Sequence, residues 1–107
     1  MSLLMPAIVG DYFSADNHHD SKAVAQCFTA DGVVRDEGRT HAGHAQAWKE
    51  AGSQQYGATV SPISADTQGA RCVVTGSVSG SFPGSPLALR FVFTLASNRI
   101  QALEIGA

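Results

Sequence analysis

The strongest pattern in the sequence is an alternation of apolar side chains over residues 87–95. Leucine or phenylalanine occupies every odd position of this stretch. Successive side chains of a strand point to opposite faces of a sheet, so this alternation is typical of a strand with one buried face. We therefore expect the odd positions to face a layer of helices, with Arg90, Val92 and Thr94 turned away from it.

The part of the chain after Gly57 is predicted to consist of strands. Turn-forming segments, such as Phe-Pro-Gly-Ser-Pro at 82–86, punctuate it. They separate predicted strands at 58–67, 70–82, 87–96 and 99–105. Connections this short favour antiparallel pairing.

The N-terminal part is predicted to be mainly helical. Apolar residues recur at the three- and four-residue spacing of one helical face at Leu4, Ile8, Tyr12 and Ala15. A second helix, capped by Asp20, should run to Phe28. A third should open after Gly43 and continue past Trp48.

Between the second and third helices, residues 33–37 alternate as a half-exposed strand. The alternation places Val34 and Asp36 on one face, so Asp36 shares its face with an apolar neighbour. Residues 38–43 then predict a turn. Helices first and a meander of strands later favour an α+β roll, with a hollow where the sheet bends around the helices.

Size and charge limit what the chain can do. Its 107 residues suffice for a single domain, residues 1–107, with a thin core. A thin core favours a homodimer in which a second copy covers the outer face of the sheet. The residues expected on that face are apolar, namely Cys72, Val74, Val78 and Val92. The formal net charge of −2 offers no basic surface for nucleic acid.

Membrane, metal and cofactor binding are not expected. No stretch approaches the roughly 20 apolar residues of a membrane span, and a cytoplasmic location is predicted. Cys27 and Cys72 should be buried, inert thiols. His18, His19 and Asp20 are adjacent, but a zinc site needs three or four convergent ligands. We therefore predict no metal and no other cofactor.

The order of these segments resembles the nuclear transport factor 2-like superfamily. The resemblance rests on Asp-Tyr-Phe at 11–13, on Val-Val-Arg-Asp-Glu-Gly at 33–38 and on the elements around them. That superfamily, also called cystatin-like, has a cone-shaped α+β fold and includes ketosteroid isomerase, the SnoaL-like polyketide cyclases and scytalone dehydratase. It implies three N-terminal helices on a curved, mainly antiparallel sheet. Residues 79–87 are similar to a small SnoaL-like subgroup.

The resemblance to ketosteroid isomerase implies roles for two residues. Tyr12 falls on the catalytic tyrosine, with the same sixteen-residue interval to Phe28. Asp36 falls on the general-base aspartate, eight residues after Phe28. The acid that should stand beside the tyrosine has no counterpart, because Leu89 or Arg90 occupies that position, depending on the register of the strand.

Asp36 is the leading catalytic candidate. A carboxylate in an apolar cavity is costly to ionise, so the pKa of Asp36 should rise toward values at which it both accepts and releases a proton. Tyr12 would donate a hydrogen bond to a substrate oxygen, and His41 could act as acid or base at the same opening. The alternatives are a solvated carboxylate, a core tyrosine and a histidine that satisfies a turn. His44 should point to solvent.

The expected substrate-binding residues are apolar and are equally typical of a plain core: Trp48, Phe13, Phe28, Leu89, Phe91 and Phe93. Three classes of function remain open. An isomerase, cyclase or dehydratase acting on a small hydrophobic carbonyl compound needs Asp36 inside a pocket. A non-catalytic binder needs only the pocket, and an interaction module needs neither.

Overall fold

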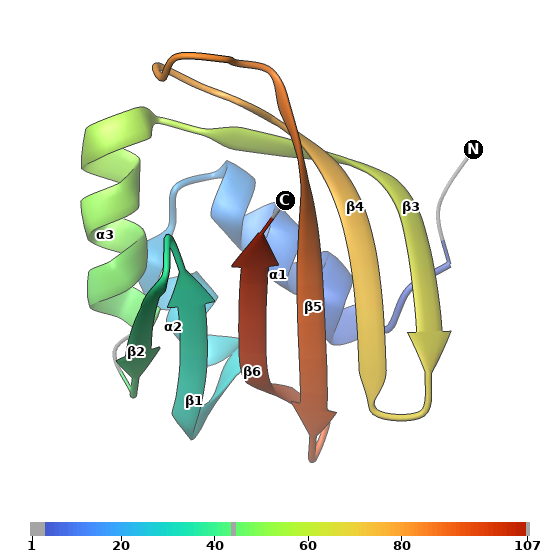
Figure 1. The fold of residues 1–107 in the computed structure, drawn as a ribbon. Coiled ribbons are helices and arrows are strands. Elements are labelled where there is room, and N and C mark those ends of the chain that lie inside the picture. The colour runs from blue at the N-terminus through green and yellow to red at the C-terminus, as the bar shows by residue number, and fades with distance from the viewer. Residues whose placement is uncertain (1–3, 44, 107) are drawn as a thin grey trace.

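The computed structural model describes residues 4–43 and 45–106, without the side chains of 53–56, so His44 lies outside the described residues. Within these ranges the chain forms three helices and six strands (Figure 1). In chain order they are α1 Ala7–Asn17, α2 Ser21–Gln26, β1 Phe28–Asp36, β2 Arg39–Ala42, α3 Ala45–Tyr56, β3 Thr59–Gln68, β4 Arg71–Ser79, β5 Leu87–Ala96 and β6 Arg99–Gly106.

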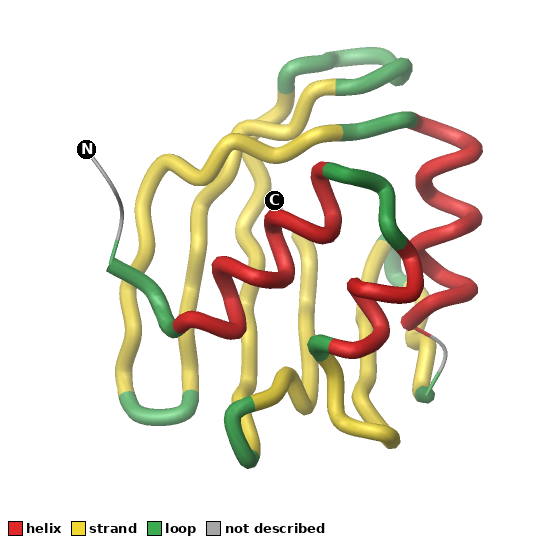
Figure 2. Tube along the Cα trace, turned by 180° about the vertical axis from the view of Figure 1, so that it is seen from behind, coloured by secondary structure: helices red, strands yellow, loops and turns green. Residues whose placement is uncertain are grey.

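The strands form one mixed sheet in the order β2-β1-β6-β5-β4-β3. The β1 and β6 strands pair in parallel, and the other neighbours pair antiparallel. Seen from behind, α1 and α2 lie across one face of this sheet, and α3 stands beside its β2 edge (Figure 2). The predicted α+β class and the four C-terminal strands are confirmed, with no strand end shifted by more than three residues.

The predicted turn over residues 38–43 is wrong in extent, because the chain reverses sooner. Glu37 and Gly38 both have positive φ angles, of 55° and 73°, and this tight reversal returns the chain as the short strand β2. The second helix also ends earlier than expected. Cys27 caps α2 and Phe28 opens β1, so Phe28 belongs to the sheet.

The prediction for the outer face of the sheet was largely wrong. Cys72 and Val74 lie directly opposite Phe93 and Phe91, and residues opposite each other on neighbouring strands share a face. Together with Val78, they are therefore buried under the helices. The adjacent pair Val73-Val74 hid the phase of the alternation, and Val73 is the residue that shares the outer face with Val92.

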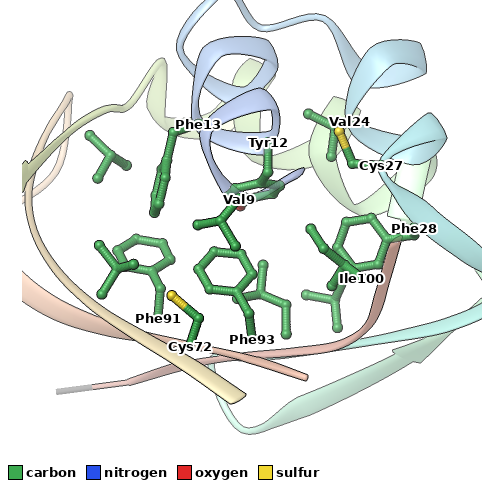
Figure 3. Packing of buried hydrophobic residues seen from close by; sticks show 14 of the residues in the cluster. Val9, Tyr12, Phe13, Val24, Cys27, Phe28, Cys72, Phe91, Phe93 and Ile100 are labelled. Atoms are coloured by element: carbon green, nitrogen blue, oxygen red, sulfur yellow. The ribbon is translucent and has the colours of Figure 1, made fainter. Parts of the chain in front are cut away.

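An aromatic cluster joins α1 to β5 in the centre of the core (Figure 3). The ring of Phe93 lies 5.4 Å from that of Tyr12 and 5.6 Å from that of Phe13, both edge to face. Phe13 also meets Phe91, at 5.3 Å. Edge-to-face contacts at these distances favour one packing of the helix on the sheet. The end of α1 is fixed separately, because Asn17 exchanges two hydrogen bonds with the backbone of Val60, of 2.8 and 2.7 Å.

Gly76 should not tolerate alanine. A Cβ atom there would lie 2.7 Å from Cγ1 of Val60 and 3.3 Å from the ring of Phe91. We expect Gly76→Ala to lower the free energy of unfolding by about 1–3 kcal/mol, as overpacked cores do. Gly10→Ala is the matched control. It adds a methyl group on an open helix surface and should stabilise by up to about 1 kcal/mol. Urea denaturation measures both, and a neutral Gly76→Ala would contradict the clash.

Candidate functional site

A pocket of about 640 Å³ lies between the helices and the inner face of the sheet. Its volume falls within the range of roughly 300–1,000 Å³ that is usual for small-molecule sites. Exposed residues mark its opening, among them Glu37, Arg39 and Leu87, whereas buried residues form its inner end. The other lining residues are Tyr12, Asp16, Asp36, Gly38, His41, Trp48, Lys49, Ala51, Gly52, Ala58, Val60, Val78, Phe82, Leu89, Phe91, Ile105 and Gly106.

Asp36 is a half-buried carboxyl group in the wall of this pocket. It ends β1, and the indole N–H of Trp48 on α3 donates to its Oδ2 atom over 3.0 Å. Burial raises the pKa of Asp36 above its ordinary value of 3.8, while the hydrogen bond from Trp48 opposes that rise. The indole therefore fixes the orientation of an acid whose protonated form the apolar surroundings favour.

Tyr12 belongs to the wall of the pocket but retains no exposed surface. Burial raises the pKa of its phenol well above 10.0, and the negative charges of Asp16 and Asp36 raise it further. Tyr12 thus remains a neutral hydrogen-bond donor. Both carboxyl groups line the same pocket as Tyr12, and Asp16 also belongs to the same helix.

His41 also lines the pocket. It lies on β2 directly opposite the buried Val34, which turns it to the same face of the sheet. The positive charge of His41 lowers the pKa of Asp36, although less than the indole does. Tyr12, Asp36 and His41, which come from three separate elements, therefore line one pocket.

The expected apolar residues divide into two groups. Trp48, Leu89 and Phe91 line the pocket. The register of β5 settles the alternative at its fourth position, because Arg90 lies opposite Thr75 on the outer face. The remaining candidates, Phe13, Phe28 and Phe93, instead belong to the core cluster. Phe13 projects from α1 onto Phe93, and the rings of Phe28 and Phe93 pack against Tyr12 of the same helix.

An ion pair that was not predicted from the sequence lies at the inner end of the pocket. The ammonium of Lys49 is 2.7 Å from Oδ1 of Asp16, and the two side chains are 7% and 9% exposed. Both line the pocket. Asp16 follows Tyr12 by one helical turn and so lies on the same face of α1. That spacing was the available signal, but charged residues on helices are usually solvated.

Replacing Trp48 by phenylalanine should raise the pKa of Asp36 further, because the carboxylate loses its donor while its surroundings stay apolar. A raised pKa means that the folded chain holds this proton more tightly than the unfolded chain. The contribution of Asp36 to the stability of the fold is therefore largest below pH 3.8 and is lost as the pH rises to the folded pKa. In the variant that pKa is higher, so the loss should continue to a higher pH. The lost bond should also cost about 1–3 kcal/mol.

Titration of the carboxyl carbon by nuclear magnetic resonance measures that pKa. Arg35→Gln is the control, because Arg35 is adjacent in sequence but pairs with Glu104, on the opposite face of β1 from Asp36. It should leave the titration of Asp36 unchanged. A Trp48→Phe chain in which Asp36 titrates at the same pH or lower would show that the indole does not stabilise the carboxylate.

The described part of the chain contains neither a cluster of metal ligands nor a membrane-spanning helix. Among residues 4–43 and 45–106, no group of three or more metal-ligating side chains converges. Within the same ranges, no helix is long and apolar enough to cross a membrane.

Comparison with known proteins gives matches among solved structures, whereas no family model and no curated protein matches the sequence. A candidate polyketide cyclase of Sinorhizobium meliloti is 38% identical, with 94% of each chain covered and a TM-score of 0.90. A Catenulispora acidiphila protein with a ketosteroid isomerase-like fold, in complex with trimethylamine, is 19% identical over 97% of this chain and 87% of its own (TM-score 0.87). A nuclear transport factor 2-like protein of Cytophaga hutchinsonii is 10% identical over 98% and 90% (TM-score 0.79).

Proposed function

Because the chain belongs to the nuclear transport factor 2-like superfamily with its SnoaL-like members, we propose that it is a cofactor-independent isomerase, cyclase or dehydratase. Its substrate would be a small hydrophobic carbonyl compound, in keeping with the apolar lining of the pocket. The observation that carries the proposal is the half-buried carboxyl group of Asp36, oriented in the pocket wall by Trp48.

The proposed reaction is a proton transfer on carbon. Asp36 takes a proton from a carbon next to the carbonyl group, and the electron pair of the broken C–H bond moves toward the carbonyl oxygen. Tyr12 stabilises the resulting enolate from the inner end of the pocket, as a neutral donor does at an oxyanion site. Asp36 then returns the proton to the same or another carbon, and His41 assists at the opening.

Asp36→Asn tests this proposal. Wild-type chain, incubated in heavy water with a panel of small apolar ketones, should introduce deuterium next to the carbonyl group, as measured by mass spectrometry. Asp36→Asn should slow this exchange by about 10²–10⁴-fold, the usual worth of a positioned general base. Asp31→Asn, an exposed acid on the same strand, is the control and should exchange at the wild-type rate. Exchange that survives in Asp36→Asn would refute the assignment.

A non-catalytic binding pocket is the second candidate. The Catenulispora acidiphila protein favours it, because that protein, which has a ketosteroid isomerase-like fold, is in complex with a small molecule, trimethylamine. On this reading ketones bind without deuterium exchange, and Asp36→Asn binds them as well as the wild type.

We further propose that the chain is a homodimer through the outer face of its sheet. Val73 and Val92 lie directly opposite each other there, and both turn away from the buried inner face. Covering them with a second copy would remove apolar surface from water. Sedimentation equilibrium should give twice the chain mass of 11.1 kDa, with Val92→Glu reduced to one chain mass. A monomeric wild type would exclude the dimer.

The cytoplasmic location stays a prediction.

A further inference from the structure

The ion pair of Lys49 with Asp16 lines the pocket, a position that it would not need if it served only to join two helices. Burying two charges costs several kcal/mol per ion, and their attraction offsets that cost only in good geometry. The pair joins α3 to α1, but it does so in the wall of the pocket. Both side chains retain a small exposed fraction, whereas Tyr12 retains none.

Lys49, Asp16 and Tyr12 all line the pocket, so a ligand at its inner end can contact the ammonium as well as the phenol. The ammonium of Lys49 has three N–H donors, and its contact of 2.7 Å with one oxygen of Asp16 uses one of them. The ammonium can therefore also donate to a ligand. No second acid can help Tyr12 from β5, because Leu89 occupies the pocket-facing position. Of the residues at this buried end, Lys49 is the one that carries a positive charge.

The carboxylate of Asp16 also places a negative charge at this end of the pocket, which a cation can offset. Asp16 lies close enough to disfavour a negative charge on Tyr12, and it would equally disfavour an anionic ligand oxygen beside that phenol. The ammonium of Lys49 offsets the carboxylate and adds a charge-assisted hydrogen bond, which is about twice as strong as a neutral one.

We propose that Lys49 donates a hydrogen bond directly to the oxygen of the ligand, with Asp16 holding the ammonium in place and Tyr12 acting as a second donor to the same oxygen. The pocket would thus select compounds whose oxygen carries or develops a negative charge, such as ketones that form enolates. This inference rests on the proposed function for the identity of its substrate class, but the oxygen-binding role can be tested without any reaction.

The probe is 4-nitrophenol, a planar compound whose visible absorption distinguishes its phenolate from its phenol. The test uses Asp36→Asn chain, because a neutral residue 36 neither repels the phenolate nor transfers a proton. The bound probe should be mainly phenolate at a pH where the free probe is mainly phenol. Failure of the proton-transfer proposal would leave this result unchanged.

The comparison chain adds Asp16→Asn and Lys49→Met, which remove both charges together and leave no unpaired ion in the core. We expect its affinity for the phenolate to fall by about 10- to 100-fold, the worth of a charge-assisted hydrogen bond, with affinity for the neutral phenol unchanged. Lys49→Arg, which keeps the charge, should retain most of the preference.

Circular dichroism first shows whether the doubly neutral chain is folded. If the folded chain keeps its preference for the phenolate, the ion pair only joins α1 to α3 and does not bind the ligand. Binding of the neutral phenol alone, or no binding of the probe to Asp36→Asn chain, would equally overturn the inference. If the doubly neutral chain does not fold, nuclear magnetic resonance of the Lys49 ammonium in the Asp36→Asn chain decides the same question, because its signal should shift when the phenolate binds and stay unchanged if the pair only joins the two helices.

Discussion

Lys49→Met alone should destabilise the fold by about 3–5 kcal/mol, because it leaves the buried carboxylate of Asp16 without its partner. A domain of this size has only about 5–15 kcal/mol of stability in total, so the variant should unfold at much lower urea concentration. Adding Asp16→Asn should recover most of the loss, since the remaining group is neutral. The double change should therefore be less harmful than the single one.

The exposed pair of Arg35 with Glu104 is the matched control. Its atoms are 4.0 Å apart and its side chains are 57% and 63% exposed. Exposed pairs contribute about 0–1 kcal/mol, so Arg35→Met should change the free energy of unfolding by no more than that. Equal changes in the free energy of unfolding for Lys49→Met and Arg35→Met would show that the pair of Lys49 with Asp16 is hydrated and that its burial does not affect stability.

Phe93→Ala should cost about 3–5 kcal/mol, the usual range for removing a buried ring. The side chain of Phe93 is fully buried and contacts both aromatic residues of α1, so its loss leaves a cavity beneath the helix. Loosening α1 should also weaken ligand binding, because the same helix carries Asp16 to the pocket.

Val92→Ala is the control for Phe93, because Val92 is the preceding residue of β5 but lies on the outer face. It should cost about 1 kcal/mol or less in a chain held monomeric by dilution. A loss below about 1.5 kcal/mol for Phe93→Ala would mean that the core collapses around the missing ring. Urea denaturation monitored by the fluorescence of Trp48 suits both variants.

Regular alternation made most of the sheet predictable. The pattern over residues 87–95 fixes the faces of β5, and the confirmed strands follow from turn residues between them. The phase of β4 could not be predicted in the same way, because Val73 and Val74 are both apolar. Only pairing with β5 decides which of them is buried, and that information lies in the partner strand.

The site was predictable in part. Asp36 and Tyr12 could be placed by resemblance and by their apolar neighbours. Asp16 and Lys49 could not, because the burial of each depends on the other and they come from helices that meet only in the folded chain. The aromatic residues show the converse limit, since composition does not distinguish a ring that lines a pocket, such as Phe91, from one that fills the core, such as Phe93.

The position of β6 has a consequence for how the chain is made. This strand follows every other described element in the sequence, yet it lies between β1 and β5 in the sheet. On a ribosome, before β6 emerges, the nascent chain would carry two separate sheet fragments, β2-β1 and β5-β4-β3. The pocket that contains Asp36 is lined by residues of both fragments, so a protein able to bind a ligand would arise only once β6 joins them.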